Sequence, residues 1–258
     1  PSSAINVFGI TGTNGKTTTA TLLYTLFKST GKKVGLLSTV KNLINNEVSI
    51  STHTTGDAIQ INALLSEMVK KGCTHCFMEV SSHAIHQNRI AGLQFDGAVF
   101  TNITHDHLDY HGDFNEYIKA KKMFFDHLSS SAFALTNSDD RHGDTMVLNT
   151  RAKIHTYGLK SMADFKCKIL ENRFSGLLLN IDNNEVWTRL VGQFNAYNLL
   201  AVYATSVLLG EDKTIVLTSL SALSSVEGRF QYVKSKNGIV GIVDYAHTPD
   251  ALENVLGT

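Results

Sequence analysis

The sequence lacks net charge, because its 23 lysines and arginines balance 23 aspartates and glutamates over 258 residues. It therefore gives no support to a nucleic-acid partner or to attraction by an anionic membrane surface. No apolar run approaches the length needed to cross a bilayer, and no signal peptide is visible, so we expect no membrane insertion and a cytoplasmic location. There is also no internal repeat and no low-complexity tract.

Cysteine is scarce as well. The three cysteines are Cys73, Cys76 and Cys167, which form no disulfide framework. Cys73 and Cys76 have C-x-x-C spacing, which is also compatible with redox or zinc chemistry. They lie at the start of an apolar strand pattern and no second pair exists, so we predict two buried thiols.

The composition is that of an ordinary globular protein, with 43% hydrophobic and 18% charged residues. The length is enough for one large α/β domain, or for one domain and a fragment of another. The chain starts at Pro1 rather than methionine, and it stops inside a helical pattern that begins at Pro249. We therefore expect a piece of a longer protein.

Apolar strand patterns alternate with helical patterns through the first half of the chain. Strands are predicted at 6–10, 34–37, 75–80, 98–102 and 132–137, and helices at 17–29, 57–71 and 114–128. This alternation favours an α/β fold with a mostly parallel, P-loop-type sheet and helices on both of its faces. Ligands of such folds lie beyond the carboxyl ends of the strands.

The pattern changes from about residue 154 to residue 190. Short alternating runs at 165–170, 177–181 and 186–190 predict an antiparallel β appendage. A nearly charge-free helix is predicted at 195–209 and a shorter helix at 214–223. Residues 224–229 read as a linker, and strands at 231–234 and 239–244 as the start of a second α/β, Rossmann-like domain. We therefore place the domain division between 1–226 and 227–258.

A glycine-rich loop carries the strongest chemical signal of the chain. The segment GITGTNGKTT at 9–18 follows an apolar strand pattern and precedes a helical one. Backbone N–H groups of such a loop close around phosphates, the lysine meets the β and γ oxygens, and the threonine hydroxyl reaches Mg²⁺. A strict P-loop has glycine where this chain has Ile10, so the loop is a variant. It could also be a simple turn from strand to helix, but Lys16 and Thr17 in this context favour phosphate binding.

Two further polar segments follow strands and should meet the glycine-rich loop at one sheet edge. Glu79 ends a strand, where a Mg²⁺ ligand is expected, although a solvated glutamate is the alternative. The segment 101–113 packs three histidines and three aspartates into one loop. Such a cluster could bind a divalent ion, relay protons or orient phosphates, and its spacing alone would allow a zinc hydrolase. The nearby phosphate loop favours a hard cation.

Three polar segments remain ambiguous from their residues alone. The run at 53–57 could bind a second anionic ligand such as a diphosphate, or it could cap the helix that follows. The amides at 192–198 could contact a base or cap a helix. The segment 244–250 follows a buried strand pattern, so its polar groups face a strand end where sites form.

Taken together, these segments resemble the Mur ligase family, and within it the tripeptide synthetases that add the third residue of the peptidoglycan stem peptide. The resemblance is carried by GTNGKTT at 12–18, TTGDA at 54–58, EVSSHA at 79–84, TNITHDHLDYHGD at 101–113, GQFNAYN at 192–198, EGRF at 227–230 and DYAHTPDAL at 244–252. They occur in family order and span nearly the whole chain. The resemblance implies that 1–226 is a central ATP-binding domain and that 227–258 opens the C-terminal domain that selects the amino acid.

The resemblance also implies ATP and Mg²⁺ as cofactors and assigns residues to them. Lys16 would hold the ATP phosphates, Thr17 and Glu79 would serve Mg²⁺, and His107 would bind a second Mg²⁺ together with a carbamylated Lys121. Nothing in the local pattern singles out Lys121 from its lysine neighbours. The remaining nucleotide contacts would come from Gly12, Thr13, Asn14, Gly15, Thr18, Asn195, Arg229 and Asp244.

The second substrate implied by the resemblance is a UDP-N-acetylmuramoyl dipeptide. Its contacts would come from His53, Thr54, Thr55, Ser81, Gln87 and Arg89. His53 stands where relatives often have asparagine, so that contact is open. The incoming amino acid would be diaminopimelate or lysine, and the selecting residues would lie past Thr258.

The activity implied is that of an ADP-forming acid–amino-acid ligase, which supports cell-wall biogenesis, cell shape and cell division. The substrate carboxylate becomes an acyl phosphate, which an amine converts to an amide, with Lys16, Lys121 and His107 as catalytic residues. Alternatives are a folylpolyglutamate synthetase-like ligase, a P-loop kinase or motor ATPase, and a nucleotide-binding module without activity. We expect a monomer, and an inactive fragment if the flanking domains are absent.

Overall fold

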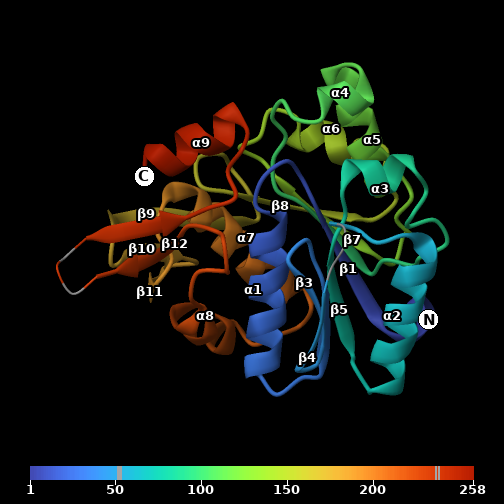
Figure 1. Cartoon of the computed structure of the whole chain (residues 1–258), viewed down its shortest axis with the longest axis horizontal. Helices are drawn as coiled ribbons and strands as arrows, with labels where there is room; N and C mark the ends of the chain where they lie inside the picture. The colour runs from blue at the N-terminus through green and yellow to red at the C-terminus, as the bar shows by residue number, and fades with distance from the viewer. Residues whose placement is uncertain (51–53, 236, 238) are drawn as a thin grey trace.

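The computed structural model describes residues 1–50, 54–235, 237 and 239–258. Its centre is an 11-stranded sheet with the order β11-β10-β9-β8-β7-β6-β1-β5-β2-β3-β4 (Figure 1). The strands of this sheet are β1 (Asn6–Thr11), β2 (Val34–Leu37), β3 (Lys41–Ile44), β4 (Glu47–Ile50), β5 (His75–Glu79), β6 (Gly97–Phe100), β7 (Phe133–Asn137), β8 (Lys153–Gly158), β9 (Phe165–Arg173), β10 (Gly176–Ile181) and β11 (Asn184–Thr188).

The helices follow the strands in the alternating order that the sequence predicts. They are a short 3₁₀ helix (Ser2–Ala4), α1 (Lys16–Ser29), α2 (Ala58–Lys70), α3 (Ser82–His86), α4 (Leu108–His111), α5 (Phe114–Asp126), α6 (Gly143–Val147), α7 (Gln193–Leu208), α8 (Lys213–Ala222) and α9 (Pro249–Leu256). The predicted helices at 17–29, 57–71, 114–128, 195–209 and 214–223 are confirmed within a few residues.

The mostly parallel sheet is confirmed. β1 pairs in parallel with β5 and β6, with Phe8 opposite Phe77 on one side and Gly97 on the other. β2 and β7 extend this parallel order on either side. These strands are continuous apolar runs because helices cover both of their faces.

Two parts of the sheet differ from the sequence-based expectation. The β3–β4 hairpin, which pairs antiparallel with β2, is not predicted because its strands are only four residues long and contain charged and amide side chains. The antiparallel appendage is also smaller than expected: β8 pairs parallel with β7, and β9 starts parallel to β8. Within this appendage, the antiparallel pairs are β9 with β10 and β10 with β11. The segment with α6 is the crossover connection that lets β8 run parallel to β7.

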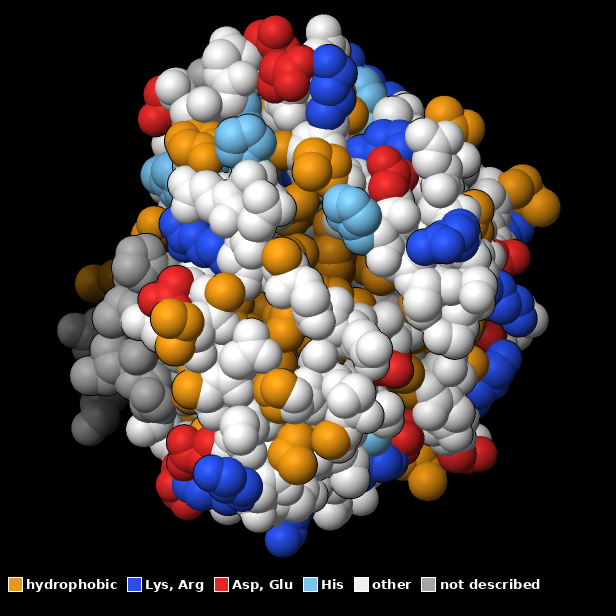
Figure 2. Space-filling model, turned by 90° about the vertical axis from the view of Figure 1, so that its right-hand side faces the viewer, with side chains coloured by type: hydrophobic (Ala, Val, Ile, Leu, Met, Phe, Trp, Pro, Cys, Tyr) orange, Lys and Arg blue, Asp and Glu red, His pale blue; other side chains and the backbone are white. Residues whose placement is uncertain are grey.

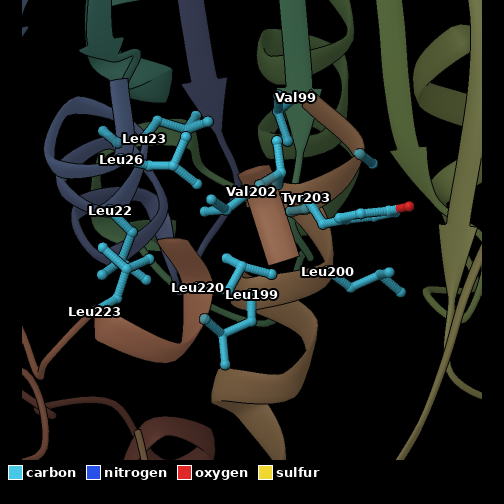
Figure 3. Close-up of a cluster of buried hydrophobic side chains, with 14 of the residues drawn as sticks. Leu22, Leu23, Leu26, Val99, Leu199, Leu200, Val202, Tyr203, Leu220 and Leu223 are labelled. Atoms are coloured by element: carbon cyan, nitrogen blue, oxygen red, sulfur yellow. The ribbon is translucent and has the colours of Figure 1, made fainter. Parts of the chain in front are cut away.

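The helices divide between the two faces of the sheet. Side chains of α1, α7 and α8 form one buried cluster with the sheet, in which Leu22, Leu199 and Leu220 meet (Figure 3). On the other face, α2, α3, α5 and α6 pack around residues such as Met78 and Phe124. Phe8 faces the first cluster and its neighbour Val7 the second, as the period-2 alternation of a strand requires.

We expect Leu199→Ala to destabilise this first layer strongly. Leu199 is 0% exposed in the cluster of Figure 3, so its truncation leaves a cavity among tightly packed neighbours. The free energy of unfolding should fall by about 2–5 kcal/mol, measured by denaturant titration. Ile59→Ala is the matched control, because Ile59 is 83% exposed on α2 and its truncation should change stability by about 0.5 kcal/mol or less. Equal losses for both variants would contradict the layered core.

The C-terminal segment forms a separate two-stranded antiparallel sheet, β12 (Gln231–Lys234) and β13 (Val240–Val243), followed by α9. The predicted strand pair is thus confirmed. Figure 1 shows this hairpin and α9 at the opposite side of the molecule from α2 and the N-terminus. The domain division at 226/227 stays a prediction.

The surface and the cysteines agree with the composition. On the face drawn in Figure 2, positive and negative side chains are scattered, and hydrophobic side chains gather in a recess near its centre. Cys73, Cys76 and Cys167 are buried free thiols, as predicted for the first two. Within the described ranges, no helix is both long and apolar enough to cross a membrane.

Candidate functional site

A cavity of about 530 Å³ opens at the carboxyl ends of the parallel strands. It collects the polar segments that follow β1, β5, β6 and β7, as expected for this class of sheet. Its lining includes Thr13, Asn14, Gly15, Lys16, Thr17, Thr18, Thr54, Glu79, Asp106, His107, Asn195, Arg229 and Asp244 from the set singled out in the sequence or its motifs.

The glycine-rich loop is held in shape by the segment that follows β6. Gly12 and Gly15 have φ angles of 148° and 85°, which side chains with a Cβ rarely adopt. The hydroxyl of Thr101 donates to the Asn14 carbonyl at 2.6 Å, and the Asn14 N–H donates to the Asn102 side chain at 2.9 Å. α1 begins directly after Gly15, so its positive dipole end faces the cavity.

Lys16 lies at the first turn of α1 with its ammonium inside the loop. Its Nζ donates to the carbonyls of Gly12 at 3.0 Å and Thr13 at 2.8 Å. Burial lowers the pKa of Lys16, while the nearby carboxyls of Glu79 and Asp106 act in the opposite direction. A cation at this position is suited to a phosphate group.

Thr17 and Glu79 place two oxygen ligands side by side. The Thr17 hydroxyl donates to Glu79 Oε2 at 3.0 Å, and the Thr39 N–H donates to Glu79 Oε1 at 2.7 Å. Glu79 is 1% exposed, and burial raises its pKa against the pull of Lys16. Arg229 reaches the same place, since its Nη2 donates to Thr17 Oγ1 at 3.0 Å. A hydroxyl and a carboxylate fit one Mg²⁺ whose other ligands are water and phosphate oxygens.

Lys121 is set apart from its neighbours by the structure. It is 1% exposed on α5, and its Nζ donates to the Gly12 carbonyl at 2.8 Å. The Lys121 Nζ atom also lies 4.7 Å from the centre of the Tyr117 ring. Lys119 instead pairs with a glutamate on the surface. Burial lowers the pKa of Lys121 well below its usual range, which favours the neutral amine.

The histidine-rich segment 101–113 splits into two groups. Asp106 and His107 line the cavity, with His107 Nε2 lying 3.4 Å from the Asp106 carboxylate, and burial lowers the pKa of His107. Tyr110 and His111 turn toward α3, where the Tyr110 ring lies 4.1 Å from that of His83. Across the described part of the chain, no three His, Cys, Asp or Glu side chains gather in a way that could hold a metal ion. The zinc-hydrolase alternative therefore gains no support.

We expect His111 to make stability depend on pH. Burial and the neighbouring His83 and His86 lower its pKa to about 4 from a usual value of 6.5. The unfolded chain then binds more protons than the folded protein between these values, so stability falls as the pH drops from 6.5 toward 4. After discounting for solvent screening, the loss should be on the order of 1 kcal/mol.

The measurement is urea unfolding of the protein and of His111→Gln at pH 8 and pH 4.5. The free energy of unfolding should fall less for His111→Gln than for the unmodified protein between pH 8 and pH 4.5. At pH 8, His111 is neutral in both the folded and the unfolded chain, so it contributes no pH dependence there. An identical pH dependence of the two proteins would show that His111 does not supply it.

Most of the predicted substrate contacts form a cluster beside Glu79. Arg89 Nη1 donates to the Thr55 carbonyl at 3.0 Å, and its Nε donates to the Gln87 side chain at 2.9 Å. The Ser81 N–H donates to Thr55 Oγ1 at 3.1 Å, and Thr55 Oγ1 donates to the Glu79 carbonyl at 2.9 Å. Thr54 lines the cavity itself, while His53 lies outside the described residues.

Asn195 and Asp244 line the cavity, and both carry internal hydrogen bonds. Asn195 Nδ2 donates to the Val191 carbonyl at 2.8 Å. The Asp244 carboxylate accepts from the N–H groups of Phe230 at 2.6 Å and Ala246 at 2.7 Å. Their first role here is thus to shape the start of α7 and the segment after β13.

The structure places Asp250, from the predicted segment 244–250, in the cavity lining and adds Asp139, which the sequence analysis did not single out. Asp250, at the start of α9, accepts from Asn14 Nδ2 at 2.9 Å and so places α9 against the phosphate loop. Asp139 follows β7 and accepts from the hydroxyl of Tyr197 at 2.8 Å. A polar N-S-D-D run directly after an apolar strand is the signal that could have indicated Asp139.

Comparison with known proteins is consistent across sequence and structure. The Mur ligase middle domain matches residues 10–206. The ligase of Cytophaga hutchinsonii named UDP-N-acetylmuramoyl-L-alanyl-D-glutamate--2,6-diaminopimelate ligase is 62% identical over 258 residues, which is 100% of this chain and 53% of that protein. A Bacillus cereus protein of the same name is 38% identical over 268 residues, covering 100% of this chain and 55% of that protein.

A solved structure of a ligase of that name superposes with a TM-score of 0.85 at 34% identity, covering 98% of this chain and 53% of that one. The chain thus spans about half the length of the curated relatives that it matches.

Proposed function

Because this chain belongs to the Mur ligase family, we propose that the intact protein that carries it is an ATP-dependent, ADP-forming amide ligase of peptidoglycan synthesis. Its substrate would be UDP-N-acetylmuramoyl-L-alanyl-D-glutamate. Diaminopimelate is the favoured amino acid over lysine, since the relatives that are 62% and 38% identical are both named for it. The roles below rest on this family relation and on the cavity.

The observation that carries the proposal is the convergence of two clusters on Glu79. On one side lie Lys16 and Thr17, which suit phosphates and a hard cation. On the other side lies the Thr55, Ser81 and Arg89 cluster, which is joined to Glu79 through Thr55. This arrangement would bring an anionic substrate to the terminal phosphate of a nucleotide.

The reaction would proceed in two displacements. A carboxylate oxygen of the dipeptide attacks the γ-phosphorus, the bond from that phosphorus to the β,γ-bridging oxygen breaks, and ADP leaves. The amine nitrogen then attacks the acyl carbon, loses a proton and expels phosphate. Lys16 would balance charge on the phosphates in the first step, and the backbone N–H groups of the loop would orient them.

The proposal includes two Mg²⁺ ions. Thr17 and Glu79 would hold the first, and His107 would hold the second together with Lys121 after carbamylation of its amine. When bound, these ions neutralise charge on the phosphoryl oxygens. The buried, depressed-pKa amine of Lys121 is the form of lysine that reacts with carbon dioxide. Asn195, Arg229 and Asp244 would contact the rest of the nucleotide.

The test is phosphate release by the intact protein with Mg-ATP and UDP-N-acetylmuramoyl-L-alanyl-D-glutamate. Three arms contain diaminopimelate, lysine or no amine. We expect release that requires the nucleotide peptide together with diaminopimelate. Release with lysine alone would reverse the choice of amino acid. Inhibition by folates in place of activity with the nucleotide peptide would favour the folylpolyglutamate synthetase-like alternative.

A second candidate function applies to the 258-residue chain by itself. Since it spans about half of its relatives, it could bind nucleotide without catalysing ligation. Binding of Mg-ATP without phosphate release in the presence of both substrates would support this reading. The cytoplasmic location, the monomeric state and the absence of a nucleic-acid partner remain predictions.

A further inference from the structure

The cavity spreads over both sides of β1. Glu79 and the predicted substrate cluster follow β5, which lies on one side of β1 in the sheet. The cavity also extends to the other side of β1, to the ends of β7 and β8 and the start of α7, where Asn137, Tyr157 and Tyr197 line it. If the terminal phosphate meets the substrate beside β5, this other side of β1 offers room for the nucleoside.

The hydroxyl of Tyr197 is locked by Asp139. It donates to Asp139 Oδ2 at 2.8 Å. The Asp139 carboxylate also accepts from the N–H groups of Leu159 at 2.7 Å, Lys160 at 2.9 Å and Ser161 at 2.7 Å. Burial works against the charge, but these hydrogen bonds hold the pKa of Asp139 well below its usual range. The carboxylate therefore only accepts, and the proton of Tyr197 stays directed at it.

Tyr157 is arranged in the same way. Its hydroxyl donates to the carbonyl of Phe100 at 3.1 Å, a backbone group that can only accept. Burial raises the pKa of both tyrosines, so both hydroxyls keep their protons. With each proton engaged inside the protein, the two phenolic oxygens can offer only lone pairs to a ligand in the cavity.

We infer that Tyr197, locked by Asp139, selects an amino-substituted purine by accepting a hydrogen bond from its exocyclic amine. Tyr157, which is 1% exposed, adds a second hydroxyl on this side of β1 whose proton is engaged inside the protein. Adenine carries a donor at its 6-position, whereas guanine carries an acceptor there. A hydroxyl oxygen that can only accept disfavours guanine, because its lone pairs would face the lone pairs of the 6-oxo group. Asp139 is a positioning residue, and the inference rests on the proposed nucleotide site.

The experiment compares ATP with purine riboside triphosphate, which lacks only the 6-amino group, in equilibrium binding to the intact protein. The unmodified protein should bind ATP about tenfold more tightly, which is the effect of one well-formed hydrogen bond. In Tyr197→Phe this gap should narrow to about twofold. Tyr203→Phe is the matched control, because that hydroxyl donates to Asp182 at 2.8 Å from the same helix and its ring lies in the buried cluster of Figure 3.

Asp139→Asn tests the lock itself. An amide can donate to Tyr197, which frees the phenolic proton to point into the cavity, so binding of GTP should improve relative to ATP. Loss of packing alone would weaken all three nucleotides equally. If the unmodified protein binds neither ATP nor its analogue, the proposed function fails. If it binds both equally, or if Tyr197→Phe keeps the tenfold gap, the inference fails while the proposed function stands.

Discussion

Replacing Lys16 with alanine should abolish turnover of the intact protein. The ammonium lies between the carbonyls of Gly12 and Thr13 at the first turn of α1, where it would meet the phosphates of the nucleotide. Its removal takes away a positive charge in a site partly shielded from water, where such charges act most strongly. We expect kcat to fall by about 10³-fold or more in the phosphate-release assay, with the fold retained.

The matched control is Lys28→Ala. Lys28 belongs to the last turn of the same helix, so the variant removes an equal charge from α1 without touching the cavity. It should keep near-normal turnover. Near-normal turnover by Lys16→Ala would refute the assignment of the loop to phosphate binding.

Glu79→Gln should have the second-largest effect, through the metal. The change keeps the size of the side chain and leaves an oxygen that accepts from the Thr39 N–H, but it removes the negative charge next to Thr17. We expect turnover to fall by about 100-fold and the Mg²⁺ concentration for half-maximal activity to rise by about tenfold, since carboxylate oxygens supply much of the affinity for this ion. Rates measured across a magnesium titration test both expectations.

Glu67→Gln provides the control for charge alone. Glu67 pairs with Lys71 on the surface of α2, so its neutralisation should leave the magnesium titration unchanged. A Glu79→Gln protein with an unaltered magnesium dependence would remove this residue from the metal site.

The parallel core and the phosphate loop could be predicted because their signals are local. A run such as 6–10 is apolar on both faces, and a glycine–lysine–threonine loop between strand and helix has few other uses. The β3–β4 hairpin and the parallel pairing of β8 could not be predicted, because they depend on which strand, distant in the sequence, has an unpaired edge. Short strands with mixed polarity leave that choice to tertiary packing.

The burial of Lys121 could have been predicted from the spacing of apolar residues in its helix. Tyr117, Ile118, Lys121, Phe124 and Phe125 recur at helical spacing, and all five are buried in the structure. A lysine on the apolar face of an amphipathic helix is rare unless it has a specific role. The helical periodicity alone could therefore have distinguished Lys121 from Lys119. No sequence pattern of this kind predicts the hydrogen bond from Tyr197 to Asp139, because only the tertiary structure brings these two residues together.

The contacts of the phosphate loop should form in a definite order while the protein is being synthesised. The loop precedes two of its hydrogen-bond partners by a long stretch of chain: Arg229 reaches Thr17 across 212 positions, and Asp250 reaches Asn14 across 236. Domains fold as units during synthesis, and contacts of such wide separation form late. The nascent sheet can therefore pack against α1 and α7 before the hydrogen bonds that complete the phosphate loop form, because these need the segment 229–250 to have been synthesised.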